Sequence, residues 1–253
     1  MLQELCKVRN LYPTFMGSEN PITNRAKYII DHLPSTPNLD VFEAYDPTLS
    51  YVNIELSFDV GSEQSIIFVA HHDIVNINSD NCLDNSASVV NLIAFAHMCR
   101  VAKLNKSIHV VFTDCEEFGG RGAQRLSERI NDGVFGNVEY VVNLELTACG
   151  TRFLCENVKD SRLCRFLLDD GFAGVSTPFN DSVILRANDI DSICITIIPD
   201  EELLQVLRTG YCETWSLCHQ SNDVVENAIE EDMNKFLEYL KDVWITNPLI
   251  ARK

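Results

Sequence analysis

The sequence predicts an α/β fold, a three-layer αβα sandwich with a mixed, mostly parallel central sheet. Short apolar runs rich in β-branched residues recur along the 253 residues, helical patterns separate them, and no linker rich in Pro, Gly or Ser interrupts the chain. Continuous apolar runs are typical of strands buried on both faces. Strands that alternate with helices imply a sheet covered by helices on both sides. We therefore expect one domain that comprises residues 1–253.

Four runs are the expected buried strands. They are SIIFVA at 65–70, SIHVVFT at 107–113, EYVVNLEL at 139–146 and SICITII at 192–198. Residues 39–58 predict a further pair of strands near the start of the chain.

The helical patterns lie between and around these runs. Residues 85–101 are apolar nearly all round, which predicts a buried helix, and 119–130 have mixed character. Near the end, apolar residues from Ile229 to Trp244 recur at helical spacing, and Asn227 and Glu230 are placed as a capping box. Residues 1–35 predict two helices broken near Pro13 and Pro21.

Composition restricts the class of partner and the compartment. The net charge of −17 predicts an acidic surface that repels phosphate backbones and anionic lipids, so neither nucleic acid nor a membrane is an expected partner. No apolar stretch approaches the length of a membrane span. The ten cysteines include no C-x-x-C pair and the N-terminus has no secretory pattern, which predicts reduced thiols and a cytoplasmic location.

Histidines and carboxylates follow the predicted strands. Because ligands bind at the carboxyl ends of strands in such sheets, we expect these side chains to share one edge. They are His71, His72 and Asp73 after the first run, Asp114, Glu116 and Glu117 after the second, Glu145 in the third, and Asp84 at the start of the buried helix.

This set of side chains is typical of a metal site. Imidazole nitrogens together with carboxylate oxygens suit Zn²⁺, with Mn²⁺ or Co²⁺ as substitutes. So many anions in one cleft would repel one another without cations. Two divalent ions about 3.5–4 Å apart, bridged by one carboxylate, would remove that repulsion.

Five motifs in order resemble those of the co-catalytic dizinc aminopeptidase family, which includes bacterial leucyl-type aminopeptidases and glutamate carboxypeptidase II. The family's His-x-Asp is matched at 71–73 and its Asp-Asn with small residues at 84–88. Its Glu-Glu-x-Gly-x-x-Gly is matched at 116–122, its Asn-x-acidic at 143–145 and its His-x-x-x-Asp at 219–223. Each motif alone is weak, but the ordered set is specific.

The resemblance implies a zinc-exopeptidase fold of the phosphorylase/hydrolase-like type and hydrolysis of N-terminal peptide bonds with two zinc ions per chain. It implies that Asp84 bridges the ions, that His71 and Glu145 complete one site, that Glu117 and His219 complete the other, that Glu116 is the general base, and that Asp73 orients His71. A weaker family segment at 180–182 places Asp181 near the substrate, a peptide or a small amino-acid derivative.

Departures from the family pattern leave alternatives open. Glu145 stands where the aminopeptidases commonly have Asp, and His72 would be a ligand if the register slipped by one. A glutaminyl-cyclase-like acyl transfer with one zinc, deacylation of an amino-acid conjugate, and a catalytically silent binding domain are rival functions. A hydrolase built on Cys218 and His219 is disfavoured because adjacent strand residues point in opposite directions. Homo-oligomerisation is a further expectation, since a chain of this length has little room for a lid over the pocket.

Overall fold

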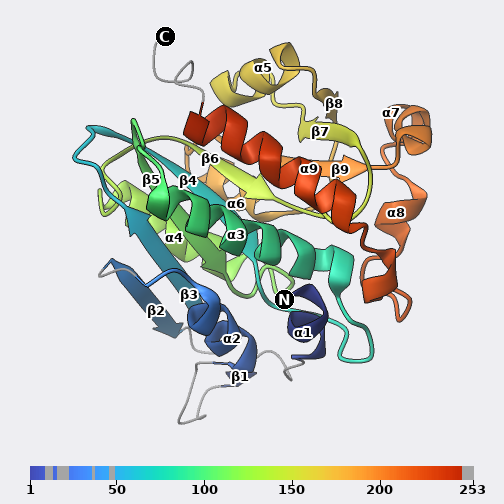
Figure 1. The fold of residues 1–253 in the computed structure, drawn as a ribbon, viewed down its shortest axis with the longest axis horizontal. Helices are drawn as coiled ribbons and strands as arrows, with labels where there is room; N and C mark the ends of the chain where they lie inside the picture. Colours follow the sequence, from blue (N-terminus) through green and yellow to red (C-terminus); the bar gives the residue numbers. More distant parts are fainter. Residues whose placement is uncertain (9–13, 16–22, 36–37, 46–48, 247–253) are drawn as a thin grey trace.

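A nine-stranded sheet organises the computed structural model, which describes residues 1–8, 14–15, 23–35, 38–45 and 49–246 (Figure 1). The strand order is β1-β3-β5-β4-β6-β9-β7-β8, and β2 pairs with β3. The strands are β1 Thr14–Phe15, β2 Leu39–Tyr45, β3 Leu49–Phe58, β4 Gln64–His71, β5 Ser107–Thr113, β6 Asn137–Leu144, β7 Arg152–Glu156, β8 Ala173–Val175 and β9 Ser192–Ile198.

Helices cover both faces of this sheet. The described helices are α1 Leu2–Lys7, α2 Asn24–His32, α3 Ala87–Val101, α4 Arg121–Asn131, α5 Arg162–Asp169, α6 Asp181–Ala187, α7 Leu203–Thr209, α8 Glu213–Ser216 and α9 Glu230–Lys241. Helices α3 and α9 lie side by side on one face, and α4 and α6 lie on the other (Figure 1). The predicted three-layer αβα architecture is therefore confirmed.

Alternation along β4 explains why the two faces bury separate cores. Successive side chains of a strand point to opposite faces. Phe68 packs in the core beneath α3 and α9, whereas Ile67 and Val69 pack in the core beneath α4 and α6. Every residue of β4 after Gln64 is buried, which accounts for the continuous apolar run in the sequence.

Four parallel strands at the centre bring their carboxyl ends to one edge. β4 pairs in parallel with β5 and with β6, and β6 pairs in parallel with β9. The outer neighbours β3 and β7 run antiparallel to β5 and β9. His71 at the end of β4 lies opposite Thr113 at the end of β5. Segments that leave these strands therefore start close together.

Most sequence-predicted elements coincide with observed ones. β5 and β9 have the predicted bounds, and β2 and β3 are the predicted early pair. β6 ends at Leu144, so Glu145 follows the strand instead of lying inside it. The N-terminal prediction of two helices matches α1 and α2, although Pro13 and Pro21 lie outside the described residues.

The predicted capping box before the last helix is wrong. Helix α9 begins at Glu230, and its N-cap is Ile229. The backbone N–H of Ile229 donates to Ala148 O (2.8 Å), which holds the chain extended at this point. Asn227 ends a short 3₁₀ turn, and its side chain donates to Asn222 O (2.7 Å).

Arg25 of α2 ties the N-terminal helices to the carboxyl edge of the sheet. Its guanidinium is fully buried. It donates to Leu5 O (3.1 Å), to His72 O (2.7 Å) and to Ser86 Oγ (3.0 Å). A charged donor makes stronger hydrogen bonds than a neutral one. Arg25 therefore fixes the segments that follow β4 and precede α3.

The sequence predicts reduced, mostly buried thiols and no membrane-spanning helix, and the structure bears on both predictions. All ten cysteines are free, eight of them buried and two half-buried. They act as small packing residues, as the sequence predicts. None of the described helices combines the length and apolar character needed to cross a membrane.

His109 on β5 should make the protein sensitive to mild acid. Its side chain is 6% exposed, and burial lowers its pKa from 6.5 to about 4. As pH falls from 6.5 towards 4, the unfolded chain binds a proton here that the folded chain does not. The free energy of unfolding should therefore fall by up to about 3 kcal/mol over this range.

Urea unfolding of metal-free protein at pH 7 and at pH 4.5 checks this expectation. In a His109→Gln variant the difference in unfolding free energy between the two pH values should shrink by about 2 kcal/mol, because pH 4.5 does not yet reach the pKa of the folded state. Gln retains a hydrogen-bonding group for Ser57 Oγ, which lies 2.8 Å from His109 Nδ1. An unchanged difference would contradict the prediction.

Candidate metal centre

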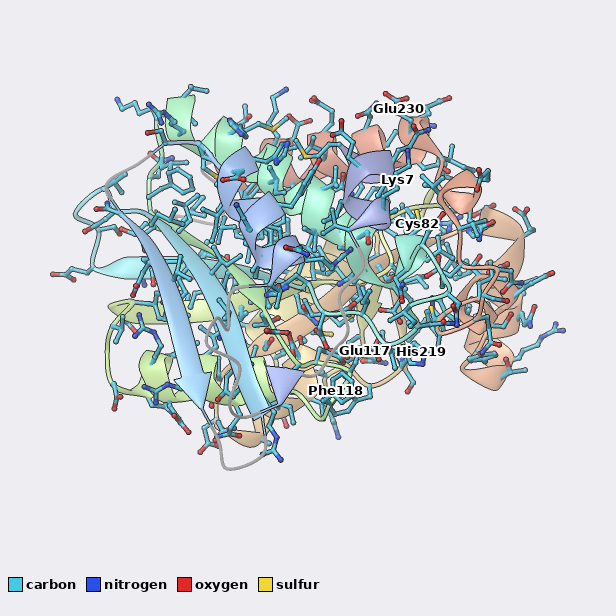
Figure 2. The ribbon with its side chains drawn as sticks, turned by 90° about the horizontal axis from the view of Figure 1, so that it is seen from below. Lys7, Cys82, Glu117, Phe118, His219 and Glu230 are labelled. Atoms are coloured by element: carbon cyan, nitrogen blue, oxygen red, sulfur yellow. The ribbon has the colours of Figure 1, made fainter. Side chains whose placement is uncertain are left out.

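Five predicted ligands come together at the carboxyl edge of the sheet. His71 is the last residue of β4, Glu117 lies in the turn after β5, and Glu145 follows β6. Asp84 lies in the turn Cys82–Ser86 before α3, where its backbone is not helical. His219 lies in the segment after α8, and Figure 2 shows it beside Glu117.

The ligands form two triads that share Asp84. In the first, His71 Nε2 lies 3.1 Å from Asp84 Oδ1 and 3.5 Å from Glu145 Oε2. In the second, His219 Nε2 lies 3.1 Å from Asp84 Oδ2 and 2.8 Å from Glu117 Oε2. The ligand atoms of each triad lie within 4.8 Å of one another. Each oxygen of Asp84 therefore faces a different histidine, as a bridging carboxylate requires.

Burial and crowding shift the pKa values of the carboxyl groups. Burial raises the pKa of Glu116 to about 11 and that of Glu117 to about 7, and it also raises the pKa of Glu145. Nearby carboxylates act in the same direction on all three. Although burial favours neutral Asp84, hydrogen bonds with His219 and His71 lower its pKa. Without cations, the carboxyl groups of the cavity cannot all ionise at neutral pH.

The same carboxylates favour the protonated, charged form of the two histidines. Hydrogen bonds with Asp84 and then Glu117 raise the pKa of His219 to about 10. Burial disfavours charged His71, but the charge of Glu145 and hydrogen bonds with Asp73 and Asp84 raise its pKa well above 6.5. Protons therefore occupy the positions that a divalent cation would take. Metal binding would displace them, because a ligating imidazole nitrogen must be unprotonated.

The donor set fits zinc at each triad. Imidazole nitrogens and carboxylate oxygens are its usual ligands in catalytic sites. Glu117 Oε1 is buried and has no hydrogen-bond partner among the described residues. A buried carboxylate oxygen without a partner is unfavourable. A cation between the members of the triad would satisfy it.

Asp73 orients His71 by contacting the ring nitrogen that does not face Asp84. Its Oδ1 lies 3.2 Å from His71 Nδ1, so it can hold the ring with Nε2 free to ligate. Its two oxygens also accept the backbone N–H groups of Glu116 and Glu117, each at 3.1 Å. One buried carboxylate thus links the segment after β4 to the segment after β5.

Three polar side chains that hold the ligands in place were not identified as functional from the sequence. Asp223 accepts the backbone N–H groups of Leu83 (2.8 Å) and Asp84 (3.3 Å). Asn76 donates to His219 O (3.1 Å). Asn85 donates to the carbonyl before Glu145 (2.9 Å) and accepts from the N–H after it (3.2 Å). Asp223 and Asn85 belong to the recognised motifs, but their partners are distant in sequence.

A cavity of about 570 Å³ opens over the two triads. Glu116 lines it and is 6% exposed. Its lining also includes the apolar and aromatic residues Leu146, Pro178, Phe179, Tyr211 and Trp215. Among the lining residues that the structure describes, every ionisable carboxyl or imidazole belongs to the triads or is Glu116, and none is Lys or Arg.

Of the other candidate residues, His72 and Asp181 do not line this cavity, whereas Cys218 does. His72 faces away from it, because its Nε2 lies 2.9 Å from Val52 O, so a one-residue slip does not occur. Asp181 is fully buried and accepts a hydrogen bond from Thr113 Oγ1 (2.5 Å). The preceding Asn180 lines the cavity, whereas Asp181 is not among the lining residues. Cys218 lines the cavity beside His219.

Solved structures with the same fold include proteins of more than one activity. A zinc aminopeptidase from Bacillus subtilis matches with 17% identity and a TM-score of 0.62, covering 75% of this chain and 48% of that one. A Zn-dependent exopeptidase from Parabacteroides distasonis matches with 18% identity and a TM-score of 0.70, covering 96% and 95%. A glutaminyl cyclase from Porphyromonas gingivalis matches with 18% identity and a TM-score of 0.73, covering 95% and 94%.

These likenesses establish the fold, and the chain spans about half the length of the B. subtilis aminopeptidase. The comparison with curated proteins found no significant match. The model of peptidase family M28 matches residues 53–239, which include all five ligands and Glu116. The matched segment covers most of the chain, and the chain belongs to peptidase family M28.

Proposed function

We propose that this chain is a zinc-dependent exopeptidase, an aminopeptidase that hydrolyses N-terminal peptide bonds with two zinc ions. The observation that carries the proposal is the pair of triads that share Asp84 and open into the cavity lined by Glu116. Membership of peptidase family M28 supports the reaction class.

The five ligands have separate tasks in this proposal. His71 and Glu145 would hold one ion, Glu117 and His219 would hold the other, and Asp84, whose two oxygens face the two histidines, would contribute to both. Bound zinc would polarise the scissile carbonyl and lower the pKa of water. Asp73 keeps His71 in the tautomer that ligates through Nε2.

Glu116 is the proposed general base. Its backbone N–H is held by Asp73, and its side chain lines the cavity. Two cations beside it would favour its carboxylate form and oppose the effect of burial on its pKa. The carboxylate accepts a proton from the attacking water and then delivers it to the nitrogen of the leaving amine.

Charge in the cavity supports an aminopeptidase over an enzyme that recognises a free carboxylate. The described lining residues include no Lys or Arg to pair with the carboxylate of an amino-acid conjugate. The nitrogen of a free α-amine could instead bind to one of the proposed zinc ions. The apolar lining that includes Trp215 suits an apolar N-terminal side chain.

The cytoplasm is the proposed location. The ten free thiols support it, because oxidising compartments favour disulfides.

A Glu116→Gln variant tests the proposed base. Gln has nearly the same shape but cannot accept the proton, so kcat should fall by about 10²–10⁴-fold. Amino-acid p-nitroanilides report the rate, and elemental analysis should find the zinc content unchanged. Glu128→Gln, on the surface of α4, is the matched control and should retain full activity. Full activity in Glu116→Gln, or parallel loss of zinc, would contradict the role of Glu116.

Ligand variants test the shared carboxylate. Wild-type protein purified without chelator should carry about two zinc ions per chain, and His71→Ala or His219→Ala should carry about one. Asp84→Ala should lose most of both ions, because both triads use its oxygens. One ion in the wild type would favour the one-zinc cyclase alternative. Equal loss in all three variants would contradict two separable triads.

Substrates with modified N-termini separate the peptidase from the cyclase. N-acetylation of leucine p-nitroanilide converts the amine to an amide and should lower kcat/KM by about 10²-fold or more, because an amide nitrogen is a poor ligand for zinc. Mass spectrometry of an N-terminal glutaminyl peptide should show release of free glutamine. Loss of ammonia with the peptide chain intact would identify a glutaminyl-cyclase-like enzyme instead.

A further inference from the structure

The two carboxylate oxygens of Glu145 have different partners. Oε2 faces the first triad, 3.5 Å from His71 Nε2. Oε1 accepts a hydrogen bond from Asn143 Nδ2 at 3.2 Å. Asn143 lies on β6 and Glu145 follows directly after that strand, and the hydrogen bond shows that the two side chains meet. Asn143 therefore restrains the ligand carboxylate on the side away from His71.

The orientation of the Asn143 amide follows from its other partner. Asn143 Nδ2 also donates to Asn180 Oδ1, at 3.3 Å. That atom is an oxygen, because it accepts the backbone N–H of Ser182 at 2.9 Å. A flipped Asn143 would place its own oxygen against two acceptors. The two N–H bonds of its amide are therefore directed at Glu145 and Asn180.

Asn180 connects this amide to the lining of the cavity. Its Nδ2 donates to Thr177 Oγ1 (3.1 Å) and to Pro178 O (2.8 Å). Thr177 and Pro178 both line the cavity. A continuous set of hydrogen bonds thus runs from the cavity wall through Asn180 and Asn143 to Glu145.

Asn143 is poorly suited to a purely structural role. It is fully buried, and its Oδ1 has no hydrogen-bond partner among the described residues. A buried acceptor without a partner lowers the stability of the fold. An apolar side chain of similar size would remove that unfavourable group. The amide is therefore best explained by what its N–H groups hold.

We propose that Asn143 is a positioning residue that holds Glu145 so that its Oε2 alone binds the cation of the first triad. The restraint suits a glutamate in particular, because its longer side chain has more rotamers to restrict than an aspartate. This inference rests on the proposed two-zinc centre. It predicts that Asn143 affects one triad and leaves the other intact.

The test isolates each triad and measures zinc binding by competition with a chromophoric chelator. A His219→Ala background retains the triad of His71, Asp84 and Glu145, whereas a His71→Ala background retains the other. Adding Asn143→Leu should raise the zinc dissociation constant about 10–100-fold in the first background. In the second background it should change by less than about threefold, because Asn143 contacts none of those ligands.

Matched variants separate positioning from a general loss of stability. Asn91→Leu removes another buried amide, on α3, which donates to Thr147 and contacts no ligand. It should leave zinc binding unchanged in both backgrounds. Asn143→Ser, whose side chain is too short to reach Glu145, provides a second test if the Leu variant does not fold. It should weaken zinc binding selectively, as Leu does.

The outcomes distinguish this inference from the proposed function. Zinc binding in both backgrounds that is insensitive to Asn143, or weakened equally in both, overturns the positioning role and leaves the two-zinc proposal standing. No zinc binding in either background, with two ions absent from the wild type, overturns the two-zinc centre and the inference with it. Selective weakening in the His219→Ala background supports both.

Discussion

Mutual repulsion among buried carboxylates is the constraint on which the centre depends. Asp84, Glu116, Glu117 and Glu145 share one cavity with two histidines, and no described lining side chain is a permanent cation. Burial alone would keep several of these acids neutral. The arrangement is stable with all of them ionised only when positive charge lies between them. Geometry, charge and donor chemistry therefore all favour the divalent ions proposed above.

The parallel core of the sheet makes that crowding possible. Strands β4, β5 and β6 run in one direction, so the segments that follow them begin at a common edge. Strands β4 and β6 end at His71 and just before Glu145, whereas Asp84, Glu117 and His219 lie in connecting segments that polar side chains hold. Arg25, Asp73 and Asp223 each bind backbone groups that lie far from them in sequence. Side chains outside the two triads therefore fix the segments that carry the candidate ligands.

The sequence was sufficient for the layers and the central strands, and it named the candidate ligands that the structure brings together. Apolar runs locate buried strands, and ligand chemistry leaves few interpretations of histidines and acids at their ends. It was insufficient wherever a side chain's partner was set by tertiary packing. From the sequence alone, His71 and His72 are both candidate ligands. The structure distinguishes them, because the side chains of these neighbouring residues point in different directions. The failed capping box has the same origin, since Ile229 is held by a backbone contact to Ala148.

The spread of the ligands along the chain imposes an order of assembly. A nascent chain that has emerged as far as Glu145 already contains every ligand of the first triad, whereas the second triad waits for His219. Asp223, which accepts the backbone N–H groups of Leu83 and Asp84, leaves the ribosome later still. A ribosome-bound intermediate of this kind therefore lacks both His219 and the hydrogen bonds from Asp223 that hold the backbone at Asp84. Stable metallation should follow synthesis of the last quarter of the protein, when loop closure between distant segments is complete.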